Sequence, residues 1–406
     1  MKEFLTLDDV EVEKKTVIVR VDINSPLDKN GKIIDNERIR AHAKTLKELS
    51  EKNAKVVVLA HQGRKGESNF ISLNQHAELL SSHIGKEVKF IDDIIGKKAI
   101  ESIKNLKEGE ILLLDNVRFL DEETEKKSAE EHAKSKLVQT LSPLANIFVQ
   151  DAFSASHRAH ASIIGFSKVL PVVAGRVMER ELTSIKKFFD PLGIHVFILG
   201  GAKPEDCLDI MEYMFNNKPE IVERVLTCGT IGEIFLVAQG YKLGRQTIEF
   251  FAKKGFLDLI PRARKLLEKY GMEIKVPIDI AFEADGERKE ISIKKLPVDP
   301  LLLDIGSETM DIYSKIIREA QRIVMKGPAG IYEKNGFEIG TKTILEEVAE
   351  SKAFTLIGGG DLGIAIEKLG IDKNMFSYIS LGGGALITYL AGKPMPGIEI
   401  LKVEEK

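Results

Sequence analysis

The segment Val17–Pro26, VIVRVDINSP, decides the fold class, because it is a short apolar strand that ends in polar residues. Similar apolar runs recur three times in the first half of the chain, at Val56–Leu59, Ile111–Leu114 and Ile147–Val149. Amphipathic helical stretches, such as Arg38–Lys52 and Glu130–Leu141, lie between these runs. Near-continuous Val/Ile/Leu strands that alternate with helices are typical of a parallel sheet covered on both faces. The first half is therefore predicted to be a doubly wound α/β domain.

The pattern changes near residue 174. Residues 174–189 have helical spacing, with no glycine after Gly175, and Pro191 ends the stretch. Strand–turn–helix units then resume, from HVFILGGAK at residues 195–203 to FSYISLGGGA at residues 376–385. We predict two doubly wound parallel-sheet, Rossmann-like domains over residues 1–173 and 190–390. A hinge helix over 174–189 would join them, and residues 391–406 would form a tail.

Composition excludes several classes of protein. The chain has 406 residues, of which 43% are hydrophobic and 30% charged, with a net charge of −3. These values argue against a disordered chain and against a wholly basic nucleic-acid-binding protein. Two cysteines allow no disulfide framework, and neither a signal peptide nor an apolar run of about 20 residues is present. We expect a soluble, cytoplasmic protein.

Cationic and polar side chains follow the strands of the first half. The polar residues are Asp22, Asn24 and His61. Four arginines lie on separate loops at the same strand ends: Arg38, Arg64, Arg118 and Arg158. Parallel strands end at one edge of a sheet, where ligands bind, and guanidinium groups bind phosphate and carboxylate at two points. The pattern predicts a site for a small phosphorylated carboxylate. The alternative is that each arginine pairs with a nearby surface acid. The pair His157 and His160 could suggest a metal site, but without a third ligand beside them an anion-site or structural role is favoured.

Glycine-rich turns follow the strands of the second half instead. They are GGAK at 200–203, KGPAG at 326–330, GGGD at 358–361 and GGGA at 382–385. Glycine lets the backbone approach a ligand, and helix N-termini attract phosphate, so these turns predict a nucleotide site. No GxxxxGK[ST] motif is present. GGGDLG matches GxGxxG, yet no acid ends the next strand, which argues against the competing reading of an NAD-dependent dehydrogenase.

Nine short sequence motifs, which follow one another along nearly the whole chain, resemble those of a known protein family. They read RVDINSP, HQGR, LLLDNVRF, DAFSASHRAH, ILGGAK, GPAGIYE, GTK, GGGD and GGGA. In these blocks the chain resembles the phosphoglycerate kinase family. The resemblance implies a glycolytic phosphotransferase with a carboxyl acceptor, which moves a phosphoryl group reversibly between 1,3-bisphosphoglycerate and ADP. A non-catalytic phosphometabolite sensor is the alternative.

The resemblance also implies roles for individual residues, with Arg38 and Lys203 as the catalytic cations. Binding of 3-phosphoglycerate in the first domain is assigned to Asp22, Ile23, Asn24, Arg38, His61, Gln62, Gly63, Arg64, Arg118 and Arg158. Binding of ADP or ATP in the second domain is assigned to Gly201, Ala202, Lys203, Lys326, Pro328, Glu333, Gly359, Gly360, Asp361, Leu362, Gly382 and Gly383. Asp361 would assist Mg²⁺, and residues 395–406 would return to the first domain. No nucleic acid or membrane partner is expected, and a monomer is favoured over a homodimer.

The chain departs from the family pattern on the nucleotide side. Cys207 stands where the family has a second lysine, and Lys326 stands where it has asparagine. Leu362, Leu381 and the segment CGTI at 228–231 differ as well. We predict that Lys326 supplies the cation that Cys207 cannot. The alternative is that Lys326 is a solvated loop lysine.

Overall fold

A computed structural model describes residues 3–403, and it divides into two compact units. Unit 1 extends to Thr183 and resumes at Pro394, and unit 2 comprises Ser184–Lys393. The division thus falls inside the segment that the sequence predicts as a hinge helix. The tail predicted over 391–406 joins unit 1 from Pro394 onward, and its last three residues lie outside the described range.

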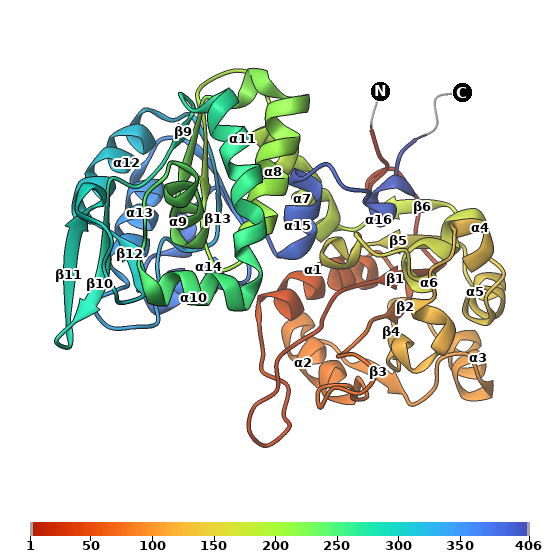
Figure 1. The fold of residues 1–406 in the computed structure, drawn as a ribbon. Coiled ribbons are helices and arrows are strands. Elements are labelled where there is room, and N and C mark those ends of the chain that lie inside the picture. Colours follow the sequence, from red (N-terminus) through yellow and green to blue (C-terminus); the bar gives the residue numbers. More distant parts are fainter. Residues whose placement is uncertain (1–2, 404–406) are drawn as a thin grey trace. The chain divides into compact units, whose positions relative to one another are not determined.

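Unit 1 contains a parallel sheet of six strands in the order β3-β4-β2-β1-β5-β6 (Figure 1). The strands are β1 (Thr16–Arg20), β2 (Lys55–Leu59), β3 (Val88–Ile91), β4 (Ile111–Leu114), β5 (Ile147–Gln150) and β6 (Val172–Ala174). Val17 and Val19 pack into one hydrophobic cluster and Ile18 into another. Because successive side chains point to opposite faces, β1 is buried on both faces, as the apolar run predicts.

The helices of unit 1 are α1 (Glu37–Glu51), α2 (Asn74–Ile84), α3 (Lys97–Lys104), α4 (Ala129–His132), α5 (Lys136–Leu141), α6 (Ala161–Ile164) and α16 (Pro396–Glu399). The single helix predicted over Glu130–Leu141 is wrong. It is two short helices, because Ser135 caps a new helix by accepting a hydrogen bond from the Val138 amide at 3.3 Å.

Helix α7 (Arg176–Phe188) carries the chain from unit 1 into unit 2. It begins two residues later than the predicted hinge helix, because Val172–Ala174 instead form the edge strand β6. The edge strands β3 and β6 did not stand out in the sequence, because both are very short.

Unit 2 contains a second parallel sheet, in the order β15-β14-β13-β7-β8-β9. Its strands are β7 (His195–Leu199), β8 (Arg224–Thr227), β9 (Ile274–Lys275), β13 (Arg322–Lys326), β14 (Phe354–Ile357) and β15 (Tyr378–Ile379). The helices are α8 (Pro204–Asn217), α9 (Gly229–Ala238), α10 (Arg245–Lys254), α11 (Ile260–Tyr270), α12 (Ser307–Glu319), α13 (Ile339–Glu350), α14 (Asp361–Lys368) and α15 (Gly384–Leu390). The predicted fold class, α/β with two doubly wound parallel sheets, is confirmed.

Unit 2 also contains a second sheet, which the sequence did not predict. It is an antiparallel sheet in the order β11-β10-β12, formed by β10 (Asp279–Ala284), β11 (Glu287–Ser292) and β12 (Leu302–Ile305) (Figure 1). Across residues 3–403, none of the helices combines the length and the apolar character needed to cross a membrane.

Each parallel sheet has one point where the strand order reverses. In unit 1 the chain runs outward from β1 through β2 and returns to the other side of β1 with β5. In unit 2 it runs outward from β7 through β8 and returns with β13. Ligands of open α/β sheets bind beyond the carboxyl ends of the strands at such reversal points. The loops after β1 and β5, and after β7 and β13, are therefore the places to look for sites.

Candidate active site

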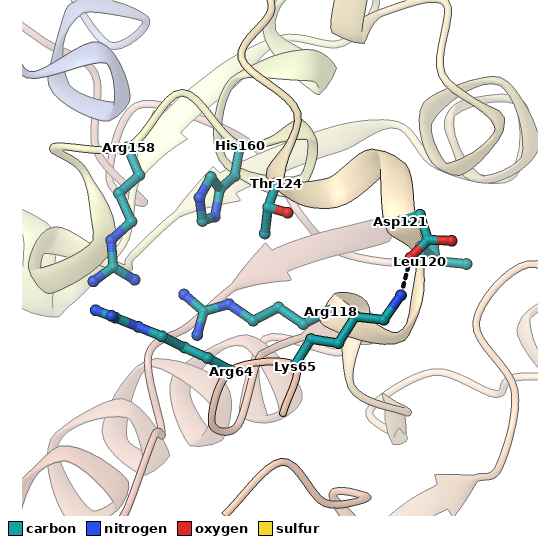
Figure 2. Close-up of a pocket in the computed structure, with 8 residues that line it drawn as sticks. All are labelled: Arg64, Lys65, Arg118, Leu120, Asp121, Thr124, Arg158 and His160. Carbon is teal, nitrogen blue, oxygen red and sulfur yellow. Dashed lines mark hydrogen bonds and ion pairs between the residues drawn. The ribbon is translucent and has the colours of Figure 1, made fainter. Parts of the chain in front are cut away.

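Three arginines from three different loops line one cavity of unit 1, which we call the arginine cavity. Arg64 follows β2, Arg118 follows β4 and Arg158 follows β5. The cavity has a volume of about 350 Å³, and its other lining residues are Lys65, Leu120, Asp121, Thr124 and His160. Figure 2 shows the three guanidinium groups pointing toward one another across the cavity.

Acids of the protein offset the positive charge of the arginine cavity only in part, because burial, Arg158 and Arg20 lower the pKa of Arg118 by more than Glu123 and Asp22 raise it. Within the described chain, none of Arg64, Arg118 and Arg158 forms an ion pair, and Arg118 Nε is buried without a hydrogen-bond partner. Burial and the neighbouring Arg158 and Arg20 lower the pKa of Arg118 to about 10. The alternative that each arginine pairs with a surface acid is therefore wrong for these three. A bound anion would relieve their repulsion.

Arg38 differs, because it pairs with Asp22, which follows β1. Arg38 Nη1 lies 3.3 Å from Asp22 Oδ2. Burial alone would raise the pKa of Asp22, but Arg38, His61 and a hydrogen bond from Ser154 hold it well below its usual range. Arg38 also acts electrostatically on the arginine cavity, since burial, then Arg64 and then Arg38 lower the pKa of Arg158. The structure therefore brings all four predicted arginines together.

The histidines beside these arginines carry no positive charge at neutral pH. Burial and then Arg158 lower the pKa of His157 to about 4. Burial and then Arg118 lower the pKa of His160 to about 3, and burial likewise lowers that of His61 well below its usual value. The cationic character of the site therefore comes from arginine and does not vary across the neutral pH range.

Arg20, in the middle of a buried strand, is a residue that the sequence reasoning missed. Arg20 Nη2 donates to His61 Nδ1 at 2.9 Å, and Arg20 Nε donates to Ser162 Oγ at 2.7 Å. Because Nδ1 of a neutral imidazole accepts here, the proton lies on Nε2, which makes that side of His61 a donor. Glu123, which accepts from Ser162 at 2.6 Å, completes this buried network. The signal was available as an arginine within the apolar run VIVRV.

Three predicted site residues lie in the framework around the cavity. Ile23 is fully buried, and the side-chain amide of Gln62 bonds to both the N–H and the C=O of Ser25, at 2.8 and 2.9 Å. Gly63 has φ +65°, and a Cβ there would lie 2.4 Å from the Asn69 carbonyl oxygen, so only glycine fits. The Gly63 amide donates to Asn24 Oδ1 at 2.9 Å, which fixes the Asn24 side chain.

In unit 2 the glycine turns after β7 and β13 contact each other at the reversal point. The Gly200 amide donates to the Lys326 carbonyl at 2.7 Å, and the Gly201 amide donates to the Pro328 carbonyl at 2.8 Å. Gly327 has φ +75°, and a Cβ there would come within 2.2 Å of the Gly200 oxygen. Gly327 is therefore needed for the close contact between the two turns. Lys203, the N-cap residue of α8, and Ala202 remain exposed beside this contact.

The other glycine turns lie at the ends of β14 and β15. A Cβ on Gly359 would lie 1.8 Å from the Ser380 carbonyl oxygen, so the turns containing Gly359–Gly360 and Gly382–Gly383 are packed side by side. Asp361 is exposed at the first position of α14, and its carbonyl accepts from the Tyr332 hydroxyl at 3.4 Å. Glu333 is exposed next to Tyr332, whereas Leu362 is 1% exposed within the hydrophobic core.

Lys326 lies directly beside Cys207. Lys326 is 7% exposed, and its ammonium nitrogen lies 3.5 Å from Cys207 Sγ and donates to the Lys203 carbonyl at 3.0 Å. The alternative of a solvated loop lysine is therefore wrong. Burial raises the pKa of the Cys207 thiol despite the lowering effect of Lys326, so the sulfur is uncharged.

Carboxylates for metal binding are sparse. Nowhere in residues 3–403 do three His, Cys, Asp or Glu side chains come together so that they could hold a metal ion by themselves. The carboxylate of Asp361 is exposed beside the glycine turns. Such a donor set fits Mg²⁺ that arrives with phosphate groups, because Mg²⁺ often takes only one or two carboxylates in addition to phosphate oxygens and water.

Comparisons with known proteins agree over nearly the whole chain. A family model described as phosphoglycerate kinase matches residues 7–393. The chain is 43% identical to a phosphoglycerate kinase of Methanothermobacter thermautotrophicus, covering 98% of this chain and 97% of the relative. It is likewise 43% identical to that of Saccharolobus solfataricus, with 98% and 97% covered. The crystal structure of phosphoglycerate kinase from Pyrococcus horikoshii is similar, with a TM-score of 0.89, 37% identity and 98% of each chain covered.

Proposed function

The chain belongs to the phosphoglycerate kinase family. On that premise we propose which residues bind each substrate and which stabilise the transferring phosphoryl group. The enzyme transfers a phosphoryl group reversibly between 1,3-bisphosphoglycerate and ADP, giving 3-phosphoglycerate and ATP. A non-catalytic sensor is not supported, since the relatives at this identity are named as kinases.

The arginine cavity is proposed to hold 3-phosphoglycerate. This proposal rests on the convergence of three guanidinium groups from separate loops, none of which forms an ion pair within the described residues. The ligand has a phosphate at one end and a carboxylate at the other, and both suit two-point binding by arginine. Further contacts are assigned to Asp22, Asn24, Arg38 and His61, and to the backbone of Ile23, Gln62 and Gly63.

The glycine turns of unit 2 are proposed to hold ADP or ATP. The backbone at Gly201, Ala202, Gly359, Gly360, Gly382 and Gly383, with Pro328 and Leu362 beside it, would approach the nucleotide. Glu333 would hold the ribose. Lys203 and Lys326 supply positive charge close to α8. Asp361 would hold Mg²⁺, which would supply positive charge toward the phosphate groups.

The chemistry requires cations rather than a general base. A carboxylate with an ordinary pKa of about 3.5 is already ionised at neutral pH and can attack without losing a proton. The transferring group develops charge on its equatorial oxygens, which fixed cations stabilise. We assign this role to Arg38 and Lys203. Asp22 fixes Arg38 by the ion pair described above.

We also propose a cellular compartment and an oligomeric state for the enzyme. Both cysteines are free and buried, which suits a reducing compartment, and we place the protein in the cytoplasm as a monomer. No nucleic acid or membrane takes part in the proposed reaction.

A coupled assay tests the proposed function. The enzyme is mixed with 3-phosphoglycerate, Mg-ATP, glyceraldehyde-phosphate dehydrogenase and NADH, and the oxidation of NADH is followed. We expect oxidation that requires every component, and NAD⁺-dependent ATP synthesis in the reverse direction. Binding of both ligands without turnover in either direction would contradict the proposal.

Closure at the hinge gives a second prediction. If α7 joins two units that must meet for transfer, 3-phosphoglycerate and Mg-ADP together should reduce the radius of gyration more than either ligand alone. Small-angle X-ray scattering of the free, singly liganded and doubly liganded enzyme measures this. An unchanged radius in the doubly liganded sample would argue for a rigid molecule.

A further inference from the structure

His42, on α1, is a buried histidine that the proposed mechanism does not use. It is 2% exposed, and both ring nitrogens are engaged. Nε2 lies 3.2 Å from the backbone N–H of Asp22 and accepts from it, and Nδ1 lies 2.9 Å from Asp151 Oδ2. Because the carboxylate can only accept, Nδ1 carries the proton of a neutral imidazole. The ring therefore bridges two aspartates in one fixed tautomer.

The aspartate on the far side of this bridge holds the start of α7. Asp151 is fully buried after β5, and its Oδ1 accepts from the amides of Val177 and Met178 at 2.8 and 3.1 Å. A carboxylate at this position satisfies free N–H groups and interacts favourably with the helix dipole. Gly175 makes the approach possible, since a Cβ there would lie 2.3 Å from Asp151 Oδ1.

The aspartate on the near side belongs to the proposed substrate site. Arg38 and His42 lie four residues apart on α1 and so share one face of it. Arg38 bonds to the carboxylate of Asp22, and His42 bonds to its backbone. One helix face thus fixes both the side chain and the main chain of Asp22.

Helix α1 contacts the first turn of α7 at a second point. Glu48 near the end of α1 pairs with Arg176, the first residue of α7, with Oε1 and Nη2 2.7 Å apart. Hydrogen bonds from Arg176 to Glu48 and Asp8 raise the pKa of Arg176 above its usual value. Helix α1 is thus linked to the start of α7 at two points, through His42 and Asp151 and through Glu48 and Arg176.

We propose that His42 is a positioning residue that links occupancy of the substrate site at Asp22 to the first turn of α7 through Asp151. Helix α7 continues past Thr183, where the first segment of unit 1 ends, so its first turn sets the direction in which the chain leaves that unit. The inference rests on the proposed function, because it takes 3-phosphoglycerate as the ligand at Asp22 and Arg38.

The rate of amide hydrogen exchange at Val177 and Met178, measured with and without 3-phosphoglycerate, tests whether ligand binding affects the first turn of α7. Two variants each keep half of the bridge. His42→Asn retains a donor near Nδ1 for Asp151 but does not reach Asp22, and His42→Gln retains an acceptor near Nε2 but does not reach Asp151. Thr45→Val is the matched control, because Thr45 is buried on the same helix and its hydroxyl has no partner.

In the parent and in Thr45→Val, the ligand is expected to slow exchange of the two amides by about fivefold or more. In both His42 variants the slowing is expected to disappear, and kcat to fall, while calorimetry still detects ligand binding. Equal slowing in parent and His42 variants, or none in the parent, would overturn the proposal. Should the His42 variants not fold, Asp151→Asn is the substitute, since it keeps an oxygen for the helix amides and removes the acceptor of the histidine proton. A parent that does not bind 3-phosphoglycerate at all would contradict the proposed function itself.

Discussion

Replacing Arg38 with alanine is expected to lower kcat by about 10²–10³-fold, as for the loss of one preorganised donor to a transition-state oxygen. Arg38 is held toward the site by its ion pair with Asp22. Because Asp22 is buried and Arg38 is the main influence that lowers its pKa, the variant should also lose some stability at neutral pH. Steady-state kinetics in the coupled assay, together with a thermal unfolding curve, measure both effects.

Two arginines serve as comparisons for Arg38. Arg64→Ala should mainly raise the KM for 3-phosphoglycerate, because Arg64 is assigned to binding of the ground state. Arg40→Ala should change kcat less than about twofold, because Arg40 lies on the surface of α1 and pairs with Asp35 and Glu37. A kcat for Arg38→Ala within a few-fold of the parent value would remove Arg38 from the catalytic role.

Lys326→Asn is expected to weaken Mg-ATP binding or turnover by about tenfold or more, equivalent to about 1.4 kcal/mol. The variant removes a buried ammonium group beside the turn that carries Lys203, and it leaves the Lys203 carbonyl without that donor. Lys342→Asn is the matched control, since Lys342 is an exposed lysine on α13 that forms an ion pair with Glu346 on the same helix. Calorimetric titration with Mg-ATP and the KM for ATP measure the effect.

A second substitution, at Cys207, is expected to restore the nucleotide binding that Lys326→Asn weakens. The Lys326 nitrogen and the Cys207 sulfur are neighbours, so adding Cys207→Lys to Lys326→Asn returns a cation to the same place, and the shorter asparagine leaves room for it. We expect this double variant to recover much of the lost affinity, a coupling that distant and independent sites do not show. Full activity of Lys326→Asn alone would mean that this cation has no role toward the nucleotide.

The sequence predicted those features that follow from local pattern. The apolar runs identified four strands of the first sheet because each is buried on both faces, and the residues after them come together because parallel strands share an edge. Short elements were missed or merged for the opposite reason. β3 and β6 are only four and three residues long, and Ser135 divides what reads as one amphipathic helix.

The supporting residues of the site could not be read from local pattern. Arg20 and Ser162 are 142 positions apart, and His42 and Asp151 are 109 apart, so only the folded chain shows that they touch. Such residues are buried polar groups that need a partner, but the sequence does not name that partner. An arginine in an apolar strand and a histidine on the inner face of a helix were the available signals. The roles assigned to individual ligand-binding residues stay predictions.

The central claim is that the two ligands bind to different units, 3-phosphoglycerate to unit 1 and the nucleotide to unit 2. Hydrogen-exchange mapping of the parent with each ligand alone tests this most directly. The account predicts that 3-phosphoglycerate slows exchange around Asn24, Gly63 and the first turn of α7. It predicts that Mg-ADP slows exchange around Gly201, Gly360 and Gly383. Protection of the unit 2 turns by 3-phosphoglycerate alone, or of the arginine cavity by Mg-ADP alone, would contradict it.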